Sequence, residues 1–287
     1  MLNHTGLMSG ADYFSDQYAI NAHMLKQPPV NIERAKQDHA NIRQAFESAG
    51  IKVVQVAPPP DCQDGVYTAN WALCRSNKAL LSALPNKREA EMPYAEKVLG
   101  DMGKEILKLP DGLHFSGQGD ALPCGKYVFV GSNYRTDLAA HPYINQLLGF
   151  EVVTLQAIPK RRFWGHGPRI INQVTGWPDS YYYDIDLALA VIKPDLIAYC
   201  PDAFIPQSQA VLAKIPINKI VVSRQEATKG FACNLVSTGE TVIMSSHAPK
   251  FQRDLESHGL KTVTPEVLEL QKGGGFIRCT SLTLDNA

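Results

Sequence analysis

The stretch IRQAFESAGIKVVQVAP, residues 42–58, decides how the chain folds, because it joins three signals in a short space. Apolar residues at helical spacing predict an amphipathic helix that ends near Ser48. Gly50 follows, where a left-handed C-terminal cap is expected, and the KVVQV after it has the Val content of a buried strand. The stretch therefore predicts a helix–turn–strand unit.

The same unit recurs along the chain, which indicates an internal repeat. Further copies occupy residues 95–110, 144–156, 209–223 and 251–266. A glycine again ends the helix in three of them, and the copy at 209–223 has Pro216 near the break.

Hairpin-like segments lie between these units. Residues 68–84, 119–132, 186–200 and 232–246 each contain two apolar runs joined by a turn. The last segment, 279–284, has one run only, and we expect the N-terminal residues 16–24 to supply its missing strand.

The chain thus contains five strand–strand–helix–strand units of about fifty residues each. We predict an α/β fold, a five-bladed pseudo-symmetric α/β propeller of ββαβ repeats, as a single domain over residues 1–287. Helices would lie outside and strands around a central channel. The alternative is a three-layer α/β sandwich.

Composition and charge narrow the function classes. The 28 basic and 28 acidic residues balance, and no Lys/Arg run stands out, so nucleic acid and membrane are not expected partners. The N-terminus does not resemble a secretory signal, and no apolar run is long enough to span a bilayer. Six scattered cysteines indicate reduced thiols in a cytoplasmic protein. No metal or cofactor motif is visible.

Polar or reactive residues stand where the first strand of each hairpin begins. They are Asn70, Asp120, Asp186, Asn234 (after Cys233) and Cys279. In a closed ring these positions converge, and a funnel of carboxylates, amides and a thiol would suit a cationic, hydrogen-bond-donating ligand such as a guanidinium. The alternative is that they cap strands and satisfy backbone groups.

Cys279 follows the glycine run in GGGFIRCTSLTL, residues 273–284. Two interpretations compete. Cys279 is a small core residue, or it is a nucleophile that the glycines let a substrate approach.

The chain resembles the pentein, or guanidino-group-modifying, superfamily, and in particular the dimethylarginine dimethylaminohydrolase and arginine deiminase-like amidinotransferase proteins. The resemblance covers nearly the whole chain, and the glycine run followed by Cys279 is its most specific part. It rests on DYFSDQYAIN (12–21), QDGVYTANWAL (63–73), FSGQGDAL (115–122), FVGSNYRTD (129–137), YYDIDLALAV (182–191) and GGGFIRCTSL (273–282). The family's five-bladed ββαβ propeller agrees with the repeat.

The resemblance implies a mechanism and a set of site residues. A cysteine thiolate, here Cys279, attacks the guanidinium carbon, an amine leaves, and the covalent amidino-thiol intermediate passes to water or to another amine. Asp64 and Asp120 match acids that hold the substrate, and Asn70 occupies a third acidic position. Arg135 matches an arginine that grips the substrate carboxylate, and Asp186 matches the acid of the family's His-x-Asp motif.

Two departures affect the proton transfers. The histidine of His-x-Asp is Asp184 here, and the glutamate of the FEGxGD-like motif is Ser116, with Gln118 nearby. Asp184 can act as the base only if burial raises its pKa towards neutrality. His114 lies two residues before Ser116, so on a strand it would face the same cavity.

Three functions follow. The first is a cysteine-dependent hydrolase, or an amidinotransferase, acting on the guanidino or ureido group of a small arginine-like cation. The second is a non-catalytic binding or regulatory protein of the same fold, which Asp184 and Ser116 favour. The third, a thiol hydrolase of esters or amides, lacks a Cys–His pair. We expect no cofactor, and a homodimer stays open.

Overall fold

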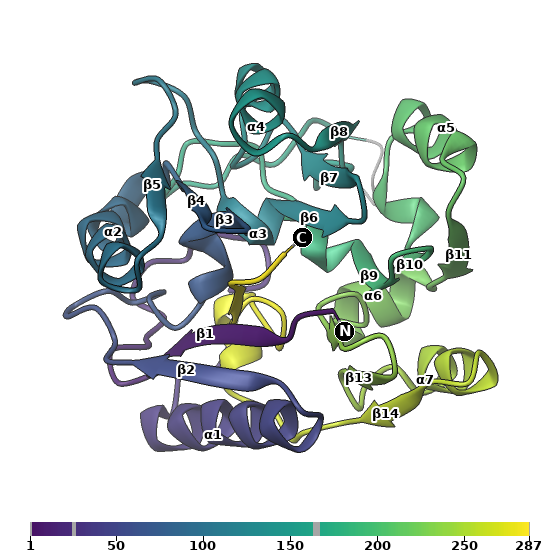
Figure 1. Ribbon diagram of the computed structural model, residues 1–287, viewed down its shortest axis with the longest axis horizontal. Helices are drawn as coiled ribbons and strands as arrows, with labels where there is room; N and C mark the ends of the chain where they lie inside the picture. The colour runs from purple at the N-terminus through teal and green to yellow at the C-terminus, as the bar shows by residue number, and fades with distance from the viewer. Residues whose placement is uncertain (1, 25–26, 163–166, 287) are drawn as a thin grey trace.

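Five three-stranded sheets form a ring in the computed structural model, which describes residues 2–24, 27–162 and 167–286. The five longer helices lie on the outer side of the ring, and the first strand of each sheet lies nearest its centre (Figure 1). The predicted five-bladed propeller is confirmed. The sandwich is excluded, since every sheet in the described residues has only three strands.

Each blade consists of an antiparallel pair, a helix, and a third strand parallel to the second. The first blade contains β15 (Leu282–Thr283), β1 (Thr5–Ser9), α1 (Ile32–Ser48) and β2 (Lys52–Val56). The second contains β3 (Ala72–Arg75), β4 (Lys78–Leu81), α2 (Met92–Asp101) and β5 (Glu105–Leu107). The third contains β6 (Ala121–Cys124), β7 (Tyr127–Gly131), α4 (His141–Leu148) and β8 (Glu151–Leu155).

The other two blades repeat this order. The fourth contains β9 (Leu189–Lys193), β10 (Leu196–Tyr199), α5 (Pro206–Lys214) and β11 (Asn218–Val221). The fifth contains β12 (Val236–Ser237), β13 (Thr241–Ile243), α7 (Pro249–Ser257) and β14 (Lys261–Val263). Short helices lie between these elements: η1 (Thr68–Asn70), η2 (Asn86–Glu91), α3 (Gly117–Asp120), η5 (Ile185–Leu187) and α6 (Arg224–Gly230).

Local sequence signals explain the helix ends. Asn31 caps α1, because its side-chain oxygen accepts a hydrogen bond from the backbone N–H of Arg34 at 3.1 Å. Four glycines that were predicted to end helices all have left-handed φ values between 74° and 84°: Gly50, Gly103, Gly149 and Gly259. Helix α5 instead ends at an extended Ile215, just before Pro216.

The strand that closes the ring is not the predicted one. Residues 5–9 form β1, which pairs antiparallel with β15 (Leu7 opposite Leu282) and parallel with β2. Residues 16–24 form no strand. The signal in TGLMS was weak, because the strand is short and contains Gly6, and the apolar residues of 16–24 pack over the centre of the ring instead.

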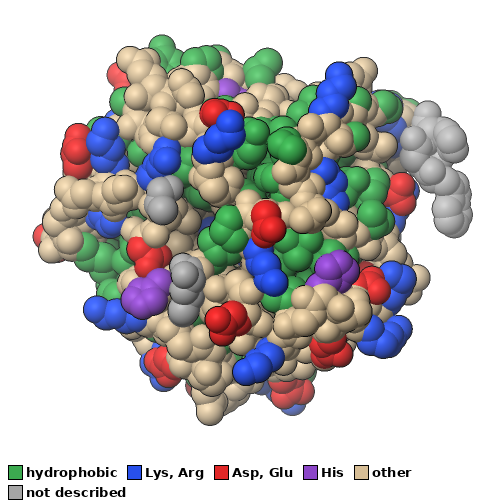
Figure 2. Space-filling model, turned by 45° about the vertical axis from the view of Figure 1, so that its right-hand side comes forward, with side chains coloured by type: hydrophobic (Ala, Val, Ile, Leu, Met, Phe, Trp, Pro, Cys, Tyr) green, Lys and Arg blue, Asp and Glu red, His purple; other side chains and the backbone are tan. Residues whose placement is uncertain are grey.

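The surface gives little hint of the interior. Acidic and basic side chains are interspersed on the face shown in Figure 2. None of the helices in the described ranges is long and apolar enough to cross a bilayer. That one domain spans residues 1–287, and that the protein is cytoplasmic, stay predictions.

Candidate active site

One-turn helices at the starts of the inner strands carry polar side chains to the centre of the ring. Asn70 ends η1, Asp120 ends α3 and Asp186 lies in η5. Asn234 and Cys279 stand in the turns before β12 and β15. All five side chains are buried. The structure therefore brings together the five positions that the repeat singled out.

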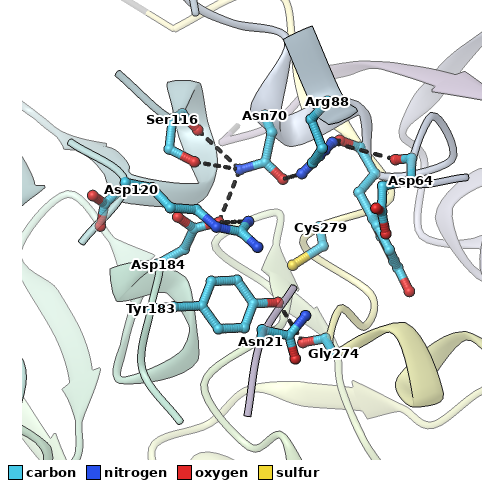
Figure 3. A network of polar contacts seen from close by, with 12 residues as sticks. Asn21, Asp64, Asn70, Arg88, Ser116, Asp120, Tyr183, Asp184, Gly274 and Cys279 are labelled. Carbon is cyan, nitrogen blue, oxygen red and sulfur yellow. Dashed lines mark hydrogen bonds and ion pairs between the residues drawn. The ribbon is translucent and has the colours of Figure 1, made fainter. Parts of the chain in front are cut away.

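Cys279 lies in the middle of this cluster. Figure 3 shows its sulfur pointing towards the side where Asp184 and Tyr183 lie. The Sγ–H donates to Asp186 Oδ2 at 3.2 Å, and Asn234 Nδ2 donates to Sγ at 3.1 Å. Burial, and next the Asp186 carboxylate, raise the pKa of the thiol well above its ordinary value. A cation placed beside the sulfur would favour the thiolate.

The Asp184 side chain is fully buried and is held by hydrogen bonds from two sides. Its Oδ2 accepts hydrogen bonds from Asn70 Nδ2 at 2.9 Å and from Arg135 Nη1 at 3.2 Å. The Arg135 guanidinium in turn lies 4.1 Å from the centre of the Tyr183 ring. Within the described residues, Asp184 Oδ1 and Asp186 Oδ1 have no hydrogen-bond partner. A buried acceptor without a donor is costly, so both oxygens favour a donor-rich ligand.

The other predicted acids are buried beside this pair. Burial, and next the charge of Asp184, raise the pKa of Asp120 well above its ordinary value. Asp120 Oδ1 accepts from the backbone N–H of Ile185 at 2.9 Å, so it also positions the Asp184–Asp186 segment. Burial raises the pKa of Asp64 to about 6, although the Arg88 charge acts against this.

Arg88 and Glu91 form a buried ion pair that the sequence did not reveal. Arg88 Nε lies 2.7 Å from Glu91 Oε1, and the side chains are 5% and 1% exposed. Arg88 Nη1 also donates to Asn70 Oδ1 at 2.7 Å, and Nη2 donates to the Asp64 carbonyl at 3.2 Å. The pair therefore holds two of the predicted site residues in place.

A third buried arginine, Arg278, lies on the chain directly before Cys279. It donates to Gln118 Oε1 at 2.8 Å and to Thr283 Oγ1 at 2.9 Å. No carboxylate oxygen of the described residues lies within 4.0 Å of its nitrogens. The Gln118 side chain therefore forms hydrogen bonds with Arg278 and β15. It does not take the place of the family's missing acid.

Carboxylates outnumber cations in this interior. Five buried carboxyl groups (Asp64, Glu91, Asp120, Asp184 and Asp186) face three buried guanidinium groups (Arg88, Arg135 and Arg278). Fully ionised, the cluster would carry two surplus negative charges. Burial and the neighbouring Asp184 charge raise the pKa values of Asp120 and Asp186, so full ionisation of the ligand-free site is disfavoured. A cationic ligand would offset the surplus charge.

Glycines allow the cluster to pack this closely. A Cβ at Gly119 would overlap Asn70 Nδ2, and it would stand 2.9 Å from Asp184 Oδ2. Gly274 has a φ of 90°, and a Cβ there would stand 2.5 Å from Asn21 Oδ1. The glycine run before Cys279 therefore makes room for the protein's own side chains. That the glycines let a substrate approach Cys279 stays a prediction.

The N-terminal residues 14–24 cover the site. Tyr18 N–H donates to Gln63 Oε1 at 2.9 Å, and Asn21 Nδ2 donates to the Gly273 carbonyl at 2.9 Å. Asn172 Nδ2 donates to the Ala19 carbonyl at 3.0 Å, which ties this cover to a second loop. A cavity of about 20 Å³, with room for one water, lies beside this cover and is lined by Ile20, Leu84, Pro85, Asn86, Arg88, Arg135, Thr175 and Trp177. Cys279 itself is only 2% exposed, so a substrate can reach its sulfur only if the cover moves.

His114 lies outside the cluster. Its side chain is 41% exposed, its Nδ1 lies 3.1 Å from Asp137 Oδ2, and its ring meets Trp177 edge-on. Ser116 is fully buried, and its oxygens accept from Asn70 Nδ2. The expectation that the two share a cavity was wrong, because Phe115 forms only an isolated bridge with Ala83 and the strand alternation does not hold.

Within the described residues, no group of three or more His, Cys, Asp or Glu is arranged to hold a metal ion. The sequence also suggests an exposed loop at KRRFWGH, residues 160–166, of which residues 163–166 lie outside the described residues.

Comparison with known proteins agrees with this geometry. The family model described as "N,N dimethylarginine dimethylhydrolase, eukaryotic" matches residues 13–284. The chain is 30% identical to N(G),N(G)-dimethylarginine dimethylaminohydrolase of Mycobacterium tuberculosis, with 96% of this chain and 84% of that protein covered.

A cyanobacterial protein is similar in sequence and in structure. The chain is 28% identical to the bifunctional arginine dihydrolase/ornithine cyclodeaminase ArgZ of Synechocystis, of which it spans only 37%. The crystal structure of the N-terminal domain of ArgZ, bound to product, superposes with a TM-score of 0.87, covering 98% of each chain. These matches identify the ring as the pentein propeller.

Proposed function

Because the chain belongs to the N,N-dimethylarginine dimethylhydrolase family, we propose that it hydrolyses the guanidino group of a small arginine-like substrate, with Cys279 as nucleophile. One observation carries the proposal. The buried Cys279 sulfur contacts Asp186, and Asp184 Oδ1 and Asp186 Oδ1 have no donor among the described residues. A guanidinium offers five N–H donors in one plane and a positive charge, which is what these atoms lack.

The roles of the remaining residues follow from charge. The substrate guanidinium binds Asp184 and Asp186. Asn70, which donates to Asp184, and Asp64 complete its surroundings, and Asp120 lies behind Asp184. The substrate carboxylate binds Arg135, which then exchanges its ion pair with Asp184 for one with the substrate. Substrate binding is thus an exchange of partners within a site that was already paired.

Attack by Cys279 on the guanidinium carbon expels an amine and leaves an amidino-thioether, which water then cleaves. Closure of residues 14–24 over the site would limit the entry of bulk water while the amine leaves. Transfer of the amidino group to a second amine instead of water is the same chemistry with another acceptor.

A non-catalytic binding protein is the second candidate, and two observations favour it. Asp184 stands where the resemblance places a histidine, and Arg135 already neutralises it in the ligand-free site. Such a protein would bind arginine-like cations without forming the thioether.

The test is amine and ammonia release from arginine, methylated arginines, agmatine and citrulline by the wild type and by Cys279→Ser. Release by the wild type alone, with a thioether adduct on Cys279 seen by mass spectrometry, supports the hydrolase. Binding by calorimetry without release would support the second candidate. Adding an amine such as glycine and identifying the product by mass separates hydrolysis from amidino transfer.

A further inference from the structure

The structure raises the question of which group moves the protons, since Asp184 stands at the histidine position. We infer that Asp186 accepts the proton of the Cys279 thiol and returns it to the leaving amine. This inference rests on the proposed function and deepens it, and it differs from the sequence-based expectation, which gave the proton role to Asp184 or His114.

Hydrogen bonding around the sulfur separates the two aspartates. Asp186 Oδ2 accepts from Cys279 Sγ at 3.2 Å, so the proton has a direct path to it. Asn234 Nδ2 donates to the sulfur at 3.1 Å, and Asn234 Oδ1 accepts the Cys279 backbone N–H at 3.2 Å. Asn234 therefore occupies a lone pair of the sulfur and orients the S–H towards Asp186.

Asp184 is unsuited to this task. Within the described residues, its side chain accepts hydrogen bonds from Asn70 and Arg135, both on Oδ2. No hydrogen bond joins it to the Cys279 sulfur there, so the thiol proton has no direct path to Asp184. Asp184 is placed to hold a cation, while Asp186 is placed to receive a proton.

The charges around Asp186 suit a group that must both accept and donate. Asp184, Arg278 and Cys279 influence the pKa of Asp186. Asp186 in turn influences the pKa values of Asp120, Tyr183 and Cys233. Burial, and next the Asp184 charge, raise the pKa of Asp186 to about 8, against the hydrogen bond from Cys279 and the Arg278 charge. A general acid–base works best when its pKa lies near the operating pH.

Each proton transfer accompanies the making or breaking of a bond to the guanidinium carbon. The thiol proton passes from Sγ to Asp186 Oδ2 while the sulfur electron pair forms the S–C bond to the guanidinium carbon. The proton then moves from Asp186 to the departing nitrogen as its C–N bond breaks, and a neutral amine leaves. In hydrolysis, water gives a proton to Asp186 and its oxygen bonds to the same carbon. The S–C bond then breaks, the sulfur leaves as the thiol with that proton, and the remaining hydroxyl proton passes to solvent as the carbonyl of the product forms.

Two substrates that differ only in their leaving group test the inference. Dimethylated arginine expels an amine, which must be protonated to leave. The S-methyl isothiourea analogue of arginine has the same charge and shape but expels a thiol, which leaves readily without a proton. Both substrates need Asp186 to take the Cys279 proton, so for Asp186→Asn we expect kcat/KM to fall on both. On dimethylated arginine, whose leaving amine must also be protonated, we expect the fall to be larger by a further factor of about 10²–10⁴.

Asp184→Asn is the matched control, since Asp184 is placed to hold the charge that both substrates share. We expect its kcat/KM to fall by similar factors on the two substrates. Equal losses for Asp186→Asn would overturn the inference while leaving the hydrolase intact. A wild type that releases product from neither substrate would overturn both.

If Asp186→Asn does not fold, the wild type supplies the same contrast through its pH dependence. Activity on dimethylated arginine should decline with rising pH earlier than activity on the isothiourea, because only the amine needs the protonated carboxyl. Identical profiles for the two substrates would count against the inference.

Discussion

Replacing Arg88 by methionine removes one half of the buried ion pair between Arg88 and Glu91. Both side chains are 5% exposed or less, so Glu91 would keep its charge without a counter-ion or water. The cost of such an uncompensated charge is about 3–5 kcal/mol. The acceptors Asn70 Oδ1 and the Asp64 carbonyl would also lose their donor. We therefore expect Arg88→Met to lower the free energy of unfolding by at least about 3 kcal/mol.

Urea unfolding followed by circular dichroism measures this change, and two controls isolate its cause. Adding Glu91→Gln to Arg88→Met removes the unpaired charge and keeps an acceptor for Trp71 Nε1, so most of the lost stability should return. Lys97→Met breaks the exposed pair with Asp101 and should change nothing measurable. A loss below about 1 kcal/mol for Arg88→Met, or a double variant no better than the single one, would refute the reasoning.

Three further predictions concern the site. Between pH 4 and about 6 the folded protein holds a proton on Asp64 that the unfolded chain has lost, so the free energy of unfolding should fall by roughly 3 kcal/mol as pH rises through this window. Asp64→Asn should lack this fall in urea titrations at pH 4.5 and 7. An unchanged fall in the variant would contradict the prediction. Asn234→Ala removes a donor to the sulfur, so alkylation of Cys279 by iodoacetamide should require higher pH, and an unshifted profile would exclude this role. Gly274→Ala should destabilise more than Gly112→Ala, since both have left-handed φ values but a Cβ meets Asn21 only at Gly274; equal losses in thermal unfolding would show that space is not limiting.

The fold could be predicted because the strand–strand–helix–strand unit recurs five times in the sequence. Helices α1, α2, α4 and α7 are amphipathic, and the glycine after each of them marks where the chain turns back towards its strand. The prediction of the closing strand was wrong. A five-residue strand that pairs with a neighbour on both sides needs little sequence signal of its own. Tertiary pairing overrode local propensity at β1.

The site was predictable where it follows the repeat and not elsewhere. Asn70, Asp120, Asp186 and Cys279 occupy equivalent places in their blades, so one alignment finds them all. Arg88 reaches the centre from η2, outside the repeating unit, and no spacing rule points to it. Burial, which only the structure shows, supplies the missing signal. An arginine and a glutamate three residues apart that are both buried indicate an internal ion pair.

Asp184 and Asp186 show a second limit of sequence reasoning. Both lie in one short segment, and only the resemblance, which puts Asp184 at the histidine position, gave them different tasks. The difference lies in which neighbours reach them, Arg135 for one and the Cys279 thiol for the other. Such contacts come from distant blades and become visible only when the ring is closed.

The pairing of β1 with β15 has a consequence for synthesis on the ribosome. A nascent chain can form its second to fifth blades in order, but its first blade waits for residues 282–283, which follow all the other blades in the sequence. Cys279 stands three residues before that strand, so the thiol acquires its neighbours in the same event that completes the ring. A chain truncated before residue 282 would therefore contain Cys279 without the closed ring that buries it.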